Sequence, residues 1–331
     1  MNPSGGKKEG KSMREISIRD VSPVRIGQVE NREAGTGCTV FLCPDGMRAG
    51  LDVRGGGPAS RESLLLDPLT AAQTVHAIVL AGGSAFGLAA ADGVMRCLEE
   101  RGIGLDVGVT RVPLVVQSDL FDLTVGDPFV RPDAAMGHAA AVAALETPNY
   151  RDGNYGAGCG ATVGKLLGME RCMKSGIGSF ALQAGDLRVG AVAAVNALGD
   201  VFDWRTGRQL AGLLGEDRRL ISSSQVLADR GRAPDFHMAA NTTLAVVITN
   251  AFFEKAALCK LAGMAQDGLA RSIRPVHTGM DGDSVYAVSA GDVPGDREIV
   301  GTLAAEAVSE AITRAVTSAE SAYGFPASKD L

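Results

Sequence analysis

The chain has 331 residues, and its 32 basic and 38 acidic side chains give a formal net charge of −6. This acidic balance disfavours nucleic acid and anionic membranes as main partners, since both require a basic face. Hydrophobic residues make up 46% of the chain and aromatic residues only 5%, so we expect a core of small aliphatic side chains.

The first thirteen residues are polar and contain three lysines. They lack the apolar segment of a signal peptide, so we interpret residues 1–13 as a disordered extension and expect a cytoplasmic location. No run of about 18 apolar residues follows, so no transmembrane helix is expected.

Short apolar and alternating runs in the first half of the chain predict several strands and two helices. The strands are expected at 39–44 and 47–53 around a Pro-Asp-Gly turn, and at 76–81, 112–117 and 122–125. The helices are expected at about 85–101, with Ser84 as N-cap, and at 133–145.

The second half is more regular. A hairpin is predicted at 175–183 and 186–196, and a polar surface excursion at 205–236. Strands at 243–249 and 284–290 alternate with helices at 252–271 and 296–316. No internal repeat or linker marks a boundary, so one layered domain with sheets covered by helices is the simplest architecture.

Several patterns that suggest cofactors or metals fail in their context. Gly156 to Ala161 matches a loose dinucleotide motif, but no apolar strand precedes it and no acid follows about 20 residues on. Asp281-Gly-Asp283 lacks the further ligands of a calcium loop. The four histidines and six cysteines show no metal spacing, so no metal or cofactor is expected.

The strongest local signal is Asn241-Thr242-Thr243 at the head of an apolar strand. A threonine hydroxyl is a weak nucleophile without a base, and no histidine is placed by the sequence to supply one. Cleavage before Thr242 would create an α-amine of pKa ~7.7–8.0 on the nucleophile itself. Attack of the Thr242 hydroxyl on the Asn241 carbonyl would therefore generate both nucleophile and base.

The chain resembles the DmpA/BapA-like family of L-aminopeptidase/D-esterases and β-peptidyl aminopeptidases, which mature by autoproteolysis. The resemblance spans about residues 18–324 and rests on motifs that occur in order along the chain. They are Gly35-Thr-Gly-Cys-Thr-Val40, Val53-Arg-Gly-Gly-Gly-Pro58, Leu80-Ala-Gly-Gly-Ser-Ala-Phe-Gly-Leu88, Gly153-Asn-Tyr-Gly-Ala-Gly158, Lys174-Ser-Gly-Ile-Gly178, Val195-Asn196, Asn241-Thr242-Thr243 and Asp281-Gly-Asp283.

The resemblance implies a role for each matching residue. Thr242 matches the N-terminal nucleophile, and Asn241–Thr242 the cleaved bond. Asn196 matches an asparagine that helps to hold the oxyanion, and Asp281 and Asp283 occupy an acidic element that anchors or orients the nucleophile.

The implied fold is an αββα four-layer sandwich, similar to N-terminal nucleophile hydrolases but differently connected. Residues 14–331 would form one domain that splits into chains 1–241 and 242–331. The resemblance also implies a homo-oligomer that needs no cofactor and acts on small peptides, amino-acid amides or esters.

Some residues depart from the family pattern. Thr242 replaces the serine of the best-known members, Asp281 and Asp283 replace Ser and Glu, and no tyrosine follows residue 116 in the segment 117–121. Two alternatives therefore stay open: an acyltransferase of the ornithine acetyltransferase type, and a non-catalytic ligand-binding descendant of the fold.

Overall fold

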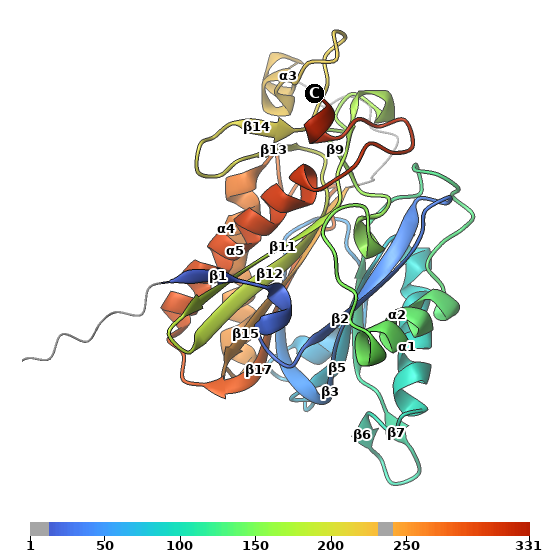
Figure 1. Ribbon diagram of the computed structural model, residues 1–331, viewed down its shortest axis with the longest axis vertical. Coiled ribbons are helices and arrows are strands. Elements are labelled where there is room, and N and C mark those ends of the chain that lie inside the picture. Colours follow the sequence, from blue (N-terminus) through green and yellow to red (C-terminus); the bar gives the residue numbers. More distant parts are fainter. Residues whose placement is uncertain (1–12, 231–240) are drawn as a thin grey trace, which may run out of the picture.

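The computed structural model describes residues 13–230 and 241–331. The expected extension at 1–13 lies outside the described residues except for Met13, which is exposed. Within the described ranges, a ten-stranded mixed sheet forms the centre of the molecule (Figure 1). Its strands are β1 (Arg14–Ile16), β2 (Arg25–Asn31), β3 (Thr36–Val53), β4 (Ala59–Arg61), β5 (Val75–Ala81), β8 (Val115–Asp119), β11 (Ile177–Ala184), β12 (Leu187–Asn196), β15 (Thr242–Ala251) and β17 (Ser284–Val293).

The strand order is β1-β11-β12-β15-β17-β3-β5-β8-β4, with β2 pairing on β3. Strands β15 and β17 run parallel to each other, as do β5 and β8, and the other pairs are antiparallel. The helices are α1 (Ala90–Glu99), α2 (Ala134–Glu146), α3 (Ser223–Arg230), α4 (Lys255–Ser272) and α5 (Arg297–Thr317).

Strand β3 runs through both sheet layers. Its first half pairs with β2 and β5, and its second half with β17. The predicted turn between two short strands is therefore wrong: the Pro-Asp-Gly segment forms an irregularity after Leu42 inside one long strand, with Gly46 at φ +82°. The bend carries the chain from one layer to the other, because a left-handed glycine turns a strand without ending it.

Three apolar clusters separate four layers, which run across Figure 1 from α4 and α5 to α1 and α2. One cluster packs β11, β12, β15 and β17 against α4 and α5. A second fills the space between the two sheet layers, with Phe41 and Ile78 facing Val246 and Tyr286. The third joins β3 and β5 to α1 and α2. The expected αββα architecture is thus confirmed, with β3 continuous between its sheets.

Short strands decorate this frame. Strands β13 (Asp200–Phe202), β14 (Gln209–Ala211) and β16 (Ile273–Arg274) form a small sheet near α3. Two further pairs are β9 (Thr162–Val163) with β10 (Met173–Lys174), and β6 (Leu105–Asp106) with β7 (Arg111–Val112). The β6–β7 hairpin projects from the body at the bottom of Figure 1.

Two local predictions fail at one place. Residues 122–125 form no strand, because the Asp122 carboxylate accepts hydrogen bonds from the Thr36 hydroxyl at 2.7 Å and from the Gly83 N–H at 2.7 Å. Ser84 does not cap an α-helix: it has φ +53° and begins a 3₁₀ turn, Ser84–Ala89, that precedes α1. The carboxylate holds the glycine-rich turn in this shape.

Candidate active site

The first residue of β15, Thr242, lies at the end of the sheet and is 4% exposed. Its strand pairs with β12 on one side and with β17 on the other. Opposite Thr242 in the antiparallel ladder stands Asn196, the last residue of β12. The two residues are neighbours because β12 ends where the antiparallel strand β15 begins.

The carbonyl oxygen of Asn241 receives two hydrogen bonds. The Thr242 hydroxyl donates one at 2.5 Å, and the backbone N–H of Gly282 donates the other at 2.9 Å. The hydroxyl therefore lies against the carbonyl of the preceding residue while a backbone amide polarises that oxygen. This arrangement suits addition of the hydroxyl to the carbonyl carbon, because donors aimed at the oxygen stabilise the charge that develops there.

The Asn196 side chain is fully buried and its orientation is fixed. Its Oδ1 accepts hydrogen bonds from Lys165 Nζ at 2.6 Å and from the Thr162 N–H at 3.1 Å. Its Nδ2 donates to the Phe121 carbonyl at 2.8 Å. These bonds fix the orientation of the amide: Oδ1 faces Lys165, and the donor Nδ2 faces away from it.

Lys165 is a buried lysine that sequence reasoning missed. Its ammonium group donates to both the side chain and the carbonyl of Asn196. Burial lowers its pKa to about 7, opposed by the negative charge of Asp281 among other groups. A buried amine with a pKa near neutrality is typical of functional sites. The available signal was a lysine set among glycine and apolar residues at 160–168.

The two predicted aspartates hold the chain on either side of the nucleophile. The backbones of Asp281 and Asn241 form an isolated parallel β-bridge, and Asp281 Oδ2 accepts a hydrogen bond from the Thr278 N–H at 2.7 Å. Burial and the neighbouring Asp283 raise the pKa of Asp281. Asp283 Oδ1 accepts the Thr243 N–H at 2.7 Å, so this carboxylate fixes the start of β15.

His277 is a second residue that sequence reasoning missed. Its Nδ1 lies 2.9 Å from Asp283 Oδ2, and its backbone N–H donates to the same oxygen at 3.1 Å. Its Nε2 is buried and has no hydrogen-bond partner among the described residues. The residue has φ +56°, a conformation that non-glycine residues seldom adopt and that these two bonds hold in place.

A glycine loop at 55–57 closes the other side of the site. The Gly57 N–H donates to the Asp281 carbonyl at 2.8 Å, and the Gly55 N–H donates to the Asp283 carbonyl. A Cβ on Gly282 would lie 2.6 Å from Thr242 Oγ1 and 3.0 Å from the Gly57 carbonyl oxygen. Only glycine fits at 282 without displacing the hydroxyl.

The structure brings together all four predicted site residues, Thr242, Asn196, Asp281 and Asp283, with Asn241 between them. In the parts of the chain that the structure describes, no group of three or more His, Cys, Asp or Glu side chains is arranged to hold a metal ion. None of the helices in those parts is both long and apolar enough to cross a bilayer.

Comparisons with known proteins find a family and relatives that match most of the chain. The family model of peptidase family S58 matches residues 17–329. An uncharacterized aminopeptidase of Mycobacterium leprae is 40% identical over 344 residues, which cover 94% of this chain and 92% of that protein. A 6-aminohexanoate-oligomer endohydrolase of an Agromyces species is 32% identical over 284 residues, covering 85% of this chain and 76% of that protein.

Two solved structures share the fold. The L-aminopeptidase D-Ala-esterase/amidase of Ochrobactrum anthropi, described as a variant of the Ntn hydrolase fold, superposes with a TM-score of 0.67. It is 18% identical, and the match covers 92% of this chain and 86% of that one. A β-aminopeptidase of a Burkholderia species superposes with a TM-score of 0.63 at 22% identity, covering 94% and 88%.

Proposed function

This chain belongs to peptidase family S58, and from that premise we propose that it is a self-processing aminopeptidase whose nucleophile is Thr242. The observation that carries the proposal is the Asn241 carbonyl oxygen, which is held between the Thr242 hydroxyl and the Gly282 N–H. The hydrolase class and the aminopeptidase activity rest on the family and its relatives.

Processing would proceed in two steps. Thr242 Oγ adds to the Asn241 carbonyl carbon, the C–N bond breaks, and the hydroxyl proton goes to the departing Thr242 nitrogen. This first step frees the α-amine of Thr242 and leaves an ester, which water hydrolyses to a carboxylate on Asn241 and a free Thr242 hydroxyl. Gly282 would stabilise the oxyanion in both steps.

The processed enzyme would use the same atoms on a substrate. The Thr242 α-amine takes the proton of its own hydroxyl as Oγ attacks the carbonyl carbon of the substrate's N-terminal residue. The bond to the leaving amine or alcohol then breaks, and the proton passes from the α-amine to that leaving group. Water hydrolyses the acyl-enzyme and releases the N-terminal residue. Asn196, oriented by Lys165, is the proposed side-chain donor to the oxyanion. Small peptides, amino-acid amides and esters are the proposed substrates, and the active form is proposed to be a homo-oligomer of processed chains.

A pair of isosteric variants tests the nucleophile. Thr242→Val removes its hydroxyl, whereas Thr243→Val removes a buried hydroxyl that has no partner among the described residues. We expect intact mass spectrometry to find residues 1–241 and 242–331 as separate chains in the wild type and in Thr243→Val. Thr242→Val should remain one chain of 331 residues. A Thr242→Val variant that still splits would overturn the proposal.

A second experiment addresses substrate class. The endohydrolase relative acts, by its name, on oligomers of 6-aminohexanoate, so that linear amide is a second candidate substrate. Purified processed enzyme should release amino acids from aminoacyl amides faster than it cleaves the 6-aminohexanoate dimer. A reversed order would favour the endohydrolase activity. Transfer of the acetyl group from N-acetylornithine without hydrolysis would favour the acyltransferase alternative.

A further inference from the structure

The backbone pairing along the outer edge of β11 is interrupted at one residue. On the outer edge of β11, Ala181 pairs with Ile16 of β1, and Ile177 exchanges two backbone hydrogen bonds with Gly153. Ser179 lies between these two pairings. Along an antiparallel strand, the backbone N–H and C=O groups of every second residue point to the same side. Those of Ser179 therefore point outward, as those of Ile177 and Ala181 do. Its carbonyl receives no backbone hydrogen bond from the described part of the chain.

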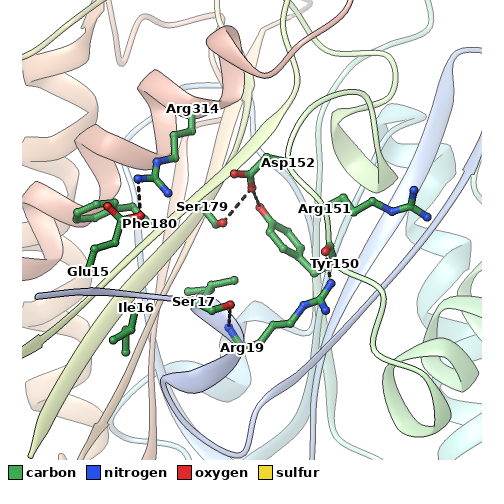
Figure 2. Close-up of a pocket in the computed structure, with 11 residues that line it drawn as sticks. Glu15, Ile16, Ser17, Arg19, Tyr150, Arg151, Asp152, Ser179, Phe180 and Arg314 are labelled. Carbon is green, nitrogen blue, oxygen red and sulfur yellow. Dashed lines mark hydrogen bonds and ion pairs between the residues drawn. The ribbon is translucent and has the colours of Figure 1, made fainter.

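This interruption opens into a cleft of about 560 Å³ (Figure 2). Along the sheet, Ser179 is four residues and two strands away from Thr242. Ideal strand geometry places the two Cα atoms roughly 16 Å apart. None of the residues that line this cleft belongs to the candidate active site, so the cleft is a separate feature.

A carboxylate lies at one side of the cleft. Asp152 Oδ1 accepts hydrogen bonds from the Tyr150 hydroxyl at 2.8 Å and from the Ser179 hydroxyl at 2.9 Å. Burial raises the pKa of Asp152, and these hydrogen bonds and the Ser179 N–H oppose that rise. Donors that converge on one carboxyl group offset part of the cost of burying its charge. In Figure 2 the second oxygen of Asp152 points toward the side of the cleft that holds Arg314.

A positive charge lies at the other side. The Arg19 guanidinium donates to the carbonyl oxygen of Tyr150, whose hydroxyl binds Asp152. The two opposite charges therefore lie at the two ends of one tyrosine residue. Two further arginines line the cleft. Arg314 pairs with Glu15 at 2.7 Å within it and lowers the pKa of Asp152, against the rise caused by burial, whereas Arg151 stacks on Tyr155 and points away from the cleft.

We propose that this cleft is a second binding site, which takes a free α-amino acid. The ammonium group of the ligand would donate to Asp152 and to the outward-facing carbonyl of Ser179, and its carboxylate would bind Arg19. Ile16 and Phe180 line the cleft and suit an apolar side chain. A zwitterion fits because its ammonium group is complementary to Asp152 and its carboxylate to Arg19, whereas a simple anion or cation is complementary to only one of them.

Calorimetric titration of L-leucine into the full-length Thr242→Val chain tests this site, because that variant cannot form the processed active site. N-acetyl-L-leucine lacks the ammonium group and L-leucinamide lacks the carboxylate. Each analogue should bind at least about tenfold more weakly than L-leucine. Absence of L-leucine binding, or equal binding of either analogue, would overturn the proposal.

Matched arginine variants in the same background locate the site. Arg19→Gln should weaken L-leucine binding about tenfold, whereas Arg151→Gln should change it less than threefold, because the Arg151 guanidinium faces Tyr155. Asp152→Asn should weaken binding as Arg19→Gln does. Equal affinities of the Arg19 and Arg151 variants would place the amino acid elsewhere. The titration measures binding alone, so it fails or succeeds independently of the proposed peptidase activity.

Discussion

Gly282 is the residue whose missing side chain matters most at the nucleophile. Its N–H donates to the Asn241 carbonyl, and a Cβ there would lie 2.6 Å from Thr242 Oγ1. We expect Gly282→Ala to slow self-cleavage about a hundredfold, since a shift of ~1 Å at reacting atoms has an effect of that size. The fraction of split chain, followed by denaturing electrophoresis after purification, measures this rate.

Gly279→Ala is the matched control for Gly282→Ala. Gly279 lies in the same loop, and an added Cβ there would meet no atom within 4 Å. It should split at the wild-type rate. Equal slowing of self-cleavage in both variants would show that any added side chain disturbs this loop. It would contradict a specific effect of the contact between residue 282 and the Thr242 hydroxyl.

Lys165 makes the stability of the folded chain depend on pH. Its pKa falls from 10.5 to about 7 on burial, so the unfolded chain holds this proton more tightly than the folded chain does. The folded state therefore gains stability as the pH rises from about 7 towards 10.5, and this contribution changes little below pH 7, where both states hold the proton. Between pH 7 and pH 9 the gain amounts to about 2–3 kcal/mol.

Comparison with Lys165→Met isolates this contribution, because the other buried lysine, Lys174, is present in both proteins. The difference in Tm between the parent and Lys165→Met should move in favour of the parent from pH 6 to pH 9. Lys329→Met, which removes a half-exposed ammonium group, should show a constant difference. A constant difference for Lys165→Met as well would contradict the prediction.

At the scale of elements, regular periodicity made the second half of the chain predictable. The hairpin, the strands beginning near 243 and 284, and the helices near 252 and 296 correspond to β11 with β12, β15, β17, α4 and α5. In each of these segments the secondary structure that the residues favour is also the one that buries their apolar side chains. The Asp296 carboxylate, for example, caps α5 by accepting two backbone N–H groups.

The first half was less predictable because distant residues decide its local shape. Nothing in the segment 82–89 indicates that Asp122, some 40 residues later, holds the turn before α1. The edge strand β1 and strand β2 were missed, since neither carries a strong alternation. Likewise, Lys165 and His277 enter the site through contacts with Asn196 and Asp283 that no spacing in the sequence reports.

The packing of α4 against the sheet and α5 gives a prediction at this scale. Leu261 on α4 is 1% exposed within the apolar cluster. In the unprocessed Thr242→Val chain, Leu261→Ala should lower the free energy of unfolding by about 2–5 kcal/mol, measured by urea denaturation. Ile299→Ala on α5, where the side chain is 55% exposed, should change it by about 0.5 kcal/mol or less. Similar losses would contradict this packing.

For the whole molecule, the proposed cut divides the sequence but not the core. Residues 242–331 supply β15, β17, α4 and α5, and β15 lies between β12 and β17 in the sheet. Both fragments therefore share one apolar cluster. We expect them to co-elute on size exclusion in buffer, at the same volume as unprocessed Thr242→Val. They should separate only in denaturant. A free fragment 242–331 in buffer would contradict this.

Light scattering on the same column measures the proposed association of processed chains. A mass that is a multiple of one processed chain pair is the expected result. The mass of a single pair, independent of concentration, would show that the enzyme acts as one copy.

The position of Thr242 as the first residue of β15 has a consequence for how the gene can be arranged. Because β15 starts where the new terminus would lie, its pairing with β12 needs no residue before Thr242. A second open reading frame encoding Met followed by residues 242–331, co-expressed with residues 1–241, would then deliver Thr242 as a terminus directly once the initiator methionine is removed. Separate translation of the two fragments would then give the free Thr242 α-amine without self-cleavage.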